Sequence, residues 1–180
     1  MSIHNLFSPR IVHYLLKRKA NQFFTSIAIR KLALGMITIF EPVFIYLYFG
    51  KSIPLTFLYF AAIFGLYGLL AVYGGKIMAR IGLKHSILTS HFFYFAYFLC
   101  LYFLEASFWL VIVAIVIKSL GRILFWPPFH TDFVRFSEED DRGKEVGKLN
   151  IASFAPSIVA PSIGGIILGA FGYHVLFVVI

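Results

Sequence analysis

The sequence has little charge for its length. Only 13% of its 180 residues are charged and 60% are apolar, whereas soluble globular domains carry roughly a quarter charged residues. It also has a single cysteine, Cys100, which lies inside an apolar run and has no second cysteine with which to form a disulfide. This composition argues against a soluble domain and predicts a protein whose solvent is lipid.

Two kinds of site are also missing from the sequence. The six histidines show no metal-ligand spacing, so we expect no metal site and no cofactor. An intramembrane enzyme would need a nucleophile and a base at the same depth, and no histidine meets that condition, so we expect no enzyme. The net charge of +8 gathers at the ends of apolar runs, which indicates membrane topology and no nucleic-acid partner.

Long apolar runs dominate what is present, and a bilayer core needs about 20 such residues. We therefore expect an all-α, polytopic membrane protein with five complete transmembrane helices and the start of a sixth. Residues 1–23 form a basic N-terminal tail, either solvated or lying as a short amphipathic helix on an anionic leaflet. The complete spans are predicted at residues 24–49, 54–78, 86–104, 108–129 and 149–171.

Proline, glycine and aromatic residues predict which spans are kinked, closely packed or lipid-facing. Pro42 should kink the first span because it lacks a backbone donor, and Pro127-Pro128 should shape the end of the fourth. The third span is crowded with aromatic residues, shows no polar stripe and is expected to lie at the lipid-facing periphery. Small residues form a stripe for close packing on the second span: Ala61, Gly65, Gly68 and Gly75.

Lysine and arginine collect on alternate links between the spans. Residues 74–84 carry three of these cations and three glycines, and we predict that they form a cytoplasmic turn between spans two and three. This bias places the N-terminus in the cytoplasm. We expect the protein itself in the plasma (cytoplasmic) membrane, which is the inner membrane of a bacterial cell. The cations assigned to the tail are Arg10, Lys17, Arg18, Lys19, Arg30 and Lys31.

The basic link carries a family resemblance. The major facilitator superfamily (MFS) has the pattern G-x-x-x-D-R-x-G-R-K between its second and third helices. Ala79 stands where that pattern has the aspartate that helps to latch the two transporter halves, and Leu83 replaces one basic residue. The matching residues are Gly75, Arg80, Gly82 and Lys84.

A second motif lies on the fifth span. The antiporter-type pattern G-x8-G-x3-G-P-x2-G-G of the same family is similar to this region, with Pro156 and Ala160 replacing two glycines. We expect its glycines to allow close helix packing, with control of leakage through the cavity as the alternative. The matching residues are Gly147, Pro161, Gly164 and Gly165.

With the topology, these motifs resemble the N-terminal half of an MFS transporter. The resemblance implies that residues 24–180 are a six-helix half truncated within helix six, whose missing partner is a C-terminal half. It implies secondary active transport of a small solute by alternating access, with proton-coupled efflux (antiport) as the candidate form. Lipid, a small-molecule substrate and protons are the other implied partners. The alternative is a non-transporting, receptor-like or truncated member of the family.

Three ionisable residues fall inside the spans that line the cavity in this family. Counted from the span ends at about 1.5 Å per residue, Glu41 lies about 12 Å and Lys118 about 15 Å below the outer surface. Because intramembrane charges are costly and are usually paired, we expect Glu41 and Lys118 to form an ion pair and to serve substrate binding or proton coupling. Arg122, one turn deeper, is expected to attract an anionic group or to snorkel to the headgroups.

Overall fold

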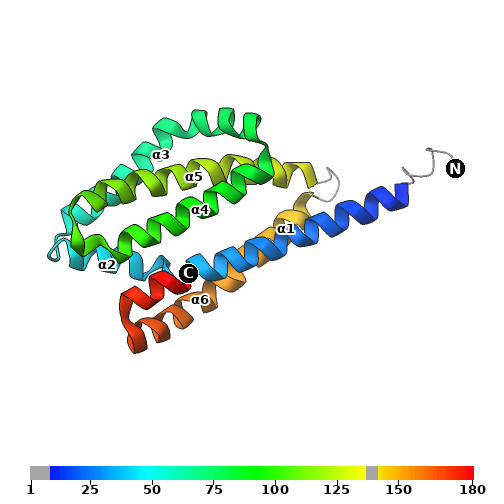
Figure 1. The fold of residues 1–180 in the computed structure, drawn as a ribbon. Coiled ribbons are helices and arrows are strands. Elements are labelled where there is room, and N and C mark those ends of the chain that lie inside the picture. Colours follow the sequence, from blue (N-terminus) through cyan, green and yellow to red (C-terminus); the bar gives the residue numbers. More distant parts are fainter. Residues whose placement is uncertain (1–8, 137–141) are drawn as a thin grey trace.

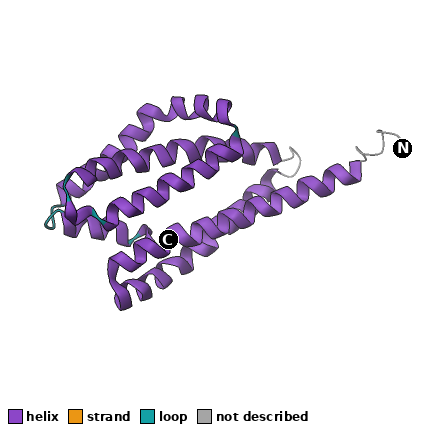
Figure 2. Ribbon diagram, in the orientation of Figure 1, coloured by secondary structure: helices purple, strands orange, loops and turns teal. Residues whose placement is uncertain are grey.

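The computed structural model describes residues 9–136 and 142–180, and nearly all of them are helical (Figure 2). Lipid offers no hydrogen-bond partners, so an apolar chain satisfies its own backbone groups within helices. The all-α class predicted from the sequence is confirmed. The elements are α1 (Pro9–Thr38), α2 (Phe40–Tyr48), α3 (Ile53–Ile81), α4 (Leu83–Tyr102), the 3₁₀ helix η2 (Leu104–Ala106), α5 (Trp109–Phe136) and α6 (Arg142–Val179).

Within the described residues, four helical stretches are long and apolar enough to cross a membrane, and they coincide with four of the five predicted spans. The remaining predicted span, the third, corresponds to α4, whose first half is more polar because it contains Lys84, His85 and His91. The predicted tail is helical from Pro9 as part of α1, while residues 1–8 and 137–141 lie outside the described residues. The four stretches are Asn21–Tyr48, Ile53–Ile81, Trp109–Val134 and Val146–Val179.

The helices form two groups that lie side by side in Figure 1. In one group α1 packs along α6, and in the other α5 packs against both α3 and α4. At Gly172, where φ is 79°, α6 breaks and the chain turns back. The following Phe177 contacts Phe44 of α2 and Phe98 of α4, with ring centroids 4.9 and 6.5 Å apart. This returning segment joins the two groups at one end.

The turn between α3 and α4 is much shorter than predicted. α3 continues as a helix through most of residues 74–84 and ends at Ile81. Gly82, with φ of 84°, reverses the chain into α4, a conformation that glycine adopts without a Cβ clash. The prediction of a turn over the whole segment was therefore wrong, because Gly74 and Gly75 are helical residues.

Pro127 and Pro128 do not end α5, which continues to Phe136. Each proline lacks the N–H that would bond to the carbonyl four residues earlier. The carbonyls of Ile123 and Leu124 are therefore left without these intrahelical donors. α5 thus extends beyond residue 129, so the predicted end of the fourth span was wrong.

Two residues from neighbouring helices contact these carbonyls. Ser86 of α4 donates a hydrogen bond from Oγ to the carbonyl of Leu124 at 2.9 Å. Gly74 of α3 lies so close to Ile123 that a Cβ at position 74 would stand 2.7 Å from its carbonyl oxygen. α3, α4 and α5 thus come into contact beside the proline pair.

Small residues also set the contact between α1 and α6. A Cβ added to Gly35 would lie 2.7 Å from the Cβ of Ala160, and one added to Gly164 would collide with the carbonyl oxygen of Met36. Gly165 allows a looser contact, 3.3 Å from a ring carbon of Phe40. The packing interpretation of Gly164 is confirmed.

The small-residue stripe on α3 has no such contact within the described residues. A Cβ added to Gly65, Gly68 or Gly75 would meet nothing within 4 Å, and the neighbouring Val72 is exposed. The predicted close packing of this stripe was therefore wrong for contacts inside this chain. The residue of α3 that does pack closely is Gly74, which faces α5.

The adjacent glycines of α3 give a matched test of this arrangement. Gly74→Ala should destabilise the protein by about 1–3 kcal/mol, because its Cβ overlaps Ile123 and forces α3 away from α5. Gly75→Ala should be neutral or stabilising by up to about 1 kcal/mol, because alanine is the better helix former. Thermal unfolding in detergent micelles measures both; equal destabilisation by the two variants would contradict the predicted contact.

Candidate functional site: an intramembrane cavity

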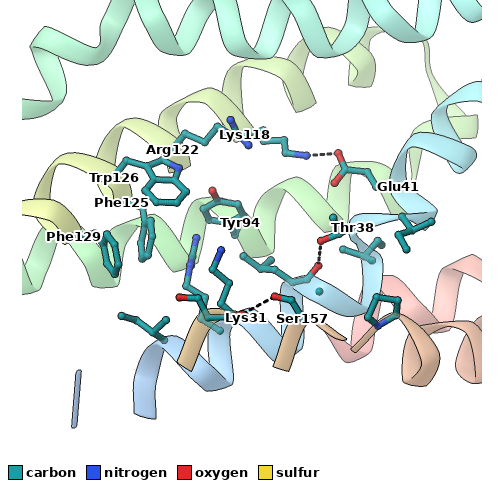
Figure 3. A pocket seen from close by; sticks show the side chains of 18 of the residues that line it. Lys31, Thr38, Glu41, Tyr94, Lys118, Arg122, Phe125, Trp126, Phe129 and Ser157 are labelled. Atoms are coloured by element: carbon teal, nitrogen blue, oxygen red, sulfur yellow. Dashed lines mark hydrogen bonds and ion pairs between the residues drawn. The ribbon is translucent and has the colours of Figure 1, made fainter. Parts of the chain in front are cut away.

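A cavity of about 800 Å³ lies between the two helix groups. α1 and α6 line one side, α3, α4 and α5 line the other, and Glu41 and Pro42 of α2 close one end. Its volume falls in the range of about 300–1,000 Å³ that is typical of small-molecule sites. Figure 3 shows that charged and aromatic side chains of α5 point into the same space as those of α1 and α2.

Glu41 owes its position to the break between α1 and α2. Pro42 has no N–H to donate to the carbonyl of Thr38, so α1 ends at Thr38 and α2 begins at Phe40. The predicted kink is confirmed as this break. Glu41 consequently lies in the first turn of α2, where the positive end of the helix dipole favours a carboxylate.

Glu41 is the centre of a buried polar network that joins four helices. Its Oε1 forms an ion pair with Nζ of Lys118 on α5 and accepts a 2.7 Å hydrogen bond from Oη of Tyr97 on α4. Oη of Tyr59 on α3 lies 3.0 Å from Oη of Tyr97. Glu41 and Lys118 are only 7% and 8% exposed. The predicted contact between them is present, while their role in transport stays a prediction.

Tyr97 was missed because α4 was interpreted as a peripheral, lipid-facing helix. That interpretation was wrong, since Ser86, Ser90, Tyr97 and Leu101 are all buried. With Tyr94, which lines the cavity, they recur every three or four residues and so lie on one helix face. This spacing was the available signal; it was hidden because tyrosines were counted with the surrounding phenylalanines as apolar.

Two further cations face the cavity. Arg30 and Lys31 of α1 line its wall within the Asn21–Tyr48 span, so their assignment to the basic tail was wrong. The guanidinium carbon of Arg30 lies 3.7 Å from the ring centre of Phe125 and 4.5 Å from that of Tyr94. Helical steps back from Glu41 through Thr38 and Leu34 reach both cations, so this spacing would have found them.

Arg122 also lines the cavity, one turn along α5 from Lys118. Its guanidinium carbon lies 4.2 Å from the ring centre of Phe64. Among the described groups its Nε has no hydrogen-bond partner although it is buried. Arg122 therefore does not form part of the Glu41 network, and its charge remains available to the cavity.

Comparison with known proteins places this arrangement in a family. The family model of the Major Facilitator Superfamily matches residues 23–180. The chain belongs to the major facilitator superfamily. No curated protein and no solved structure matched the chain. As an MFS protein it is a multi-pass membrane protein of a family of secondary transporters, and it is not an enzyme.

The motif residues that carried the MFS resemblance lie in different environments. Arg80 and Lys84 are exposed on either side of the Gly82 turn and do not line the cavity. On α6, Pro161 lines the cavity, whereas a Cβ at Gly147 would meet nothing within 4 Å. The structure thus brings Glu41, Lys118 and Arg122 to one MFS cavity and leaves most motif residues outside it.

A double-mutant cycle tests the buried ion pair. Lys118→Met should destabilise the MFS chain by about 3–5 kcal/mol, because it leaves the Glu41 carboxylate buried without its cation. Glu41→Gln combined with Lys118→Met should cost less than Lys118→Met alone, since both charges are removed together.

The measurement is denaturant unfolding in detergent micelles, with exposed residues as the control pair. Lys51→Met and Glu105→Gln change residues that are both exposed, and their effects should add. Additive costs at Glu41 and Lys118 would show that their contact contributes nothing to stability.

Proposed function

We propose that this chain forms one half of a secondary active transporter that moves a small solute by alternating access, and that Glu41 carries a coupling proton. The supporting observation is the Glu41–Lys118 ion pair, which is buried in the cavity wall at membrane depth. Ionisable groups in that position are rare and are concentrated in proton relays and solute pathways. A purely structural bundle would not need them.

The position of the pair connects its chemistry to movement. α2 continues from α1, which packs on α6, whereas Lys118 belongs to α5, which packs on α3 and α4. The ion pair therefore links one helix group to the other. Protonation neutralises the Glu41 carboxylate and leaves the ion pair with one charge, which weakens that link. Proton binding therefore biases the two helix groups towards a different relative position.

The rest of the transporter follows from the family. We propose that residues 24–180 are its N-terminal six-helix half, and that a second half supplies the facing wall of the solute pathway. Residues 1–23 and the remaining basic links place the N-terminus in the cytoplasm and the protein in the plasma (inner) membrane. With Arg30 and Lys31 assigned to the span, Arg10 and Lys17–Lys19 remain in the tail, so the bias keeps its direction with fewer cations.

The glycine motif of α6 resembles the antiporter pattern and so suggested antiport, but close helix packing accounts for its Gly164. Gly164 contacts Met36 across the α1–α6 interface, and such contacts serve any helix bundle in lipid. Proton antiport therefore stays a prediction from resemblance alone. A non-transporting MFS module remains the competing function, and the buried charges of the cavity favour transport over it.

Glu41→Gln should abolish or uncouple transport, because glutamine retains the shape of the side chain but cannot gain or lose a proton. Solute uptake driven by an imposed pH gradient is measured in proteoliposomes that contain the chain together with its second half. Glu105→Gln is the control, since Glu105 is exposed in η2 outside the cavity. Wild-type uptake with unchanged pH dependence in Glu41→Gln would reject the proton-carrying role.

A further inference from the structure

We propose that the transported solute is an organic anion with an aromatic or similarly apolar body. Its anionic group would lie among Arg30, Lys31 and Arg122, and its body against the aromatic wall of α5. This inference rests on the proposed function, because it names the solute for the same cavity.

The charges on the cavity wall are strongly unbalanced. Arg30, Lys31, Lys118 and Arg122 line it, whereas Glu41 is the one carboxylate among the described lining residues. Lys118 already forms the ion pair with Glu41. The other three cations lie on a wall without a matching anion, and charge of one sign at membrane depth is expensive. A bound anion supplies the missing charge.

Aromatic rings hold two of these cations in place without neutralising them. Arg30 lies against the faces of Phe125 and Tyr94, and Arg122 lies against Phe64. A cation–π contact stabilises a guanidinium by about 0.5–2 kcal/mol but contributes no negative charge. It also orients the guanidinium in advance, which reduces the entropy lost when an anion binds.

Next to these cations α5 presents an apolar surface. The rings of Phe125 and Phe129 are stacked with centroids 5.3 Å apart, and Trp126 meets Phe129 edge-on at 5.8 Å. All three line the cavity, and Figure 3 shows them beside Arg122 and Tyr94. Phe125 and Phe129 are buried in a core cluster with Ile27, and the half-buried Trp126 extends this apolar wall into the cavity, where a flat or apolar solute body fits against it.

The anion and the proton on Glu41 should favour each other's binding. The groups that contact the Glu41 carboxylate are Lys118 of α5 and Tyr97 of α4, with Tyr59 of α3 bonded to Tyr97. Arg30 and Lys31 of α1 and Arg122 of α5 share the cavity, while the described α6 residues that line it are uncharged. Protonating Glu41 makes the cavity more positive, so linkage tightens anion binding. This is the sign of symport.

Tryptophan fluorescence provides a binding assay on the full chain in detergent micelles. Trp126 lies in the cavity wall, whereas Trp109 is 73% exposed at the start of α5. Trp109→Phe therefore isolates the signal of Trp126. The probes are 4-phenylbutyrate, 4-phenylbutylammonium and 4-phenylbutanol, which share one body and differ in charge, and butyrate, which has the charge without the ring.

We expect 4-phenylbutyrate to bind at least about tenfold more tightly than each of the other three probes. Arg122→Gln and Arg30→Gln should each abolish this preference, and Arg122→Lys should retain it because it preserves the charge. Lys76→Gln, which removes an exposed cation of α3, should leave it unchanged. Tighter binding of the ammonium or the alcohol, equal binding of butyrate, or no binding of 4-phenylbutyrate would each overturn the anion assignment.

The same titration separates this inference from the proposed function. Between about pH 8 and about pH 6 the probe stays ionised, so affinity that rises as the pH falls reports on the protein. That rise should vanish in Glu41→Gln. An anion preference without any pH dependence would support the solute class and contradict the coupling role of Glu41. A pH dependence that requires Glu41, without an anion preference, would support the coupling role of Glu41 and contradict the solute class.

Discussion

The structure depends on the need to pair a charge that lies in lipid. Lys118 is placed at membrane depth by an apolar helix, and an isolated ammonium group there would be strongly destabilising. Glu41 provides the partner only because Pro42 interrupts the first span and leaves the carboxylate at the start of α2. Tyr97 and Tyr59 then extend the contact to α4 and α3. One ion pair thereby sets the relative position of elements that are far apart in the sequence.

The contacts within each helix group are of a different kind. Gly74 against Ile123, and Gly164 against Met36, bring backbones together at distances that any side chain would prevent. Such contacts are permanent features of the packing and do not respond to protons or solutes. The link between the groups, in contrast, is the ion pair between Glu41 and Lys118. The structure thus combines close backbone packing inside each group with a charged contact between the groups.

The sequence allowed the spans to be predicted from bilayer thickness and helical rise. The central pair also needed the family resemblance, which implied that its two spans line one cavity. Glu41 and Lys118 had to be at similar depth whatever the detailed packing. It did not allow Tyr97 to be identified, since tyrosine is compatible with a lipid-facing surface and with a buried hydrogen bond alike. The position of the turn at Gly82, within residues 74–84, was also beyond reach, because glycine in a membrane helix marks close packing as often as a chain reversal. Arg30 was assigned to the tail because a count of loop charges does not consider depth.

Arg30 has a consequence for how the bundle is made. A helix that carries Arg30 and Lys31 near its middle partitions poorly into lipid by itself, at about 2.5–3.5 kcal/mol for each charge. The rings that receive Arg30 belong to Tyr94 of α4 and Phe125 of α5, and both are synthesised after α1. The first helix therefore reaches its final environment only when later helices have arrived. The same cations that line the cavity thus tie the placement of the first span to helices that follow it in the chain.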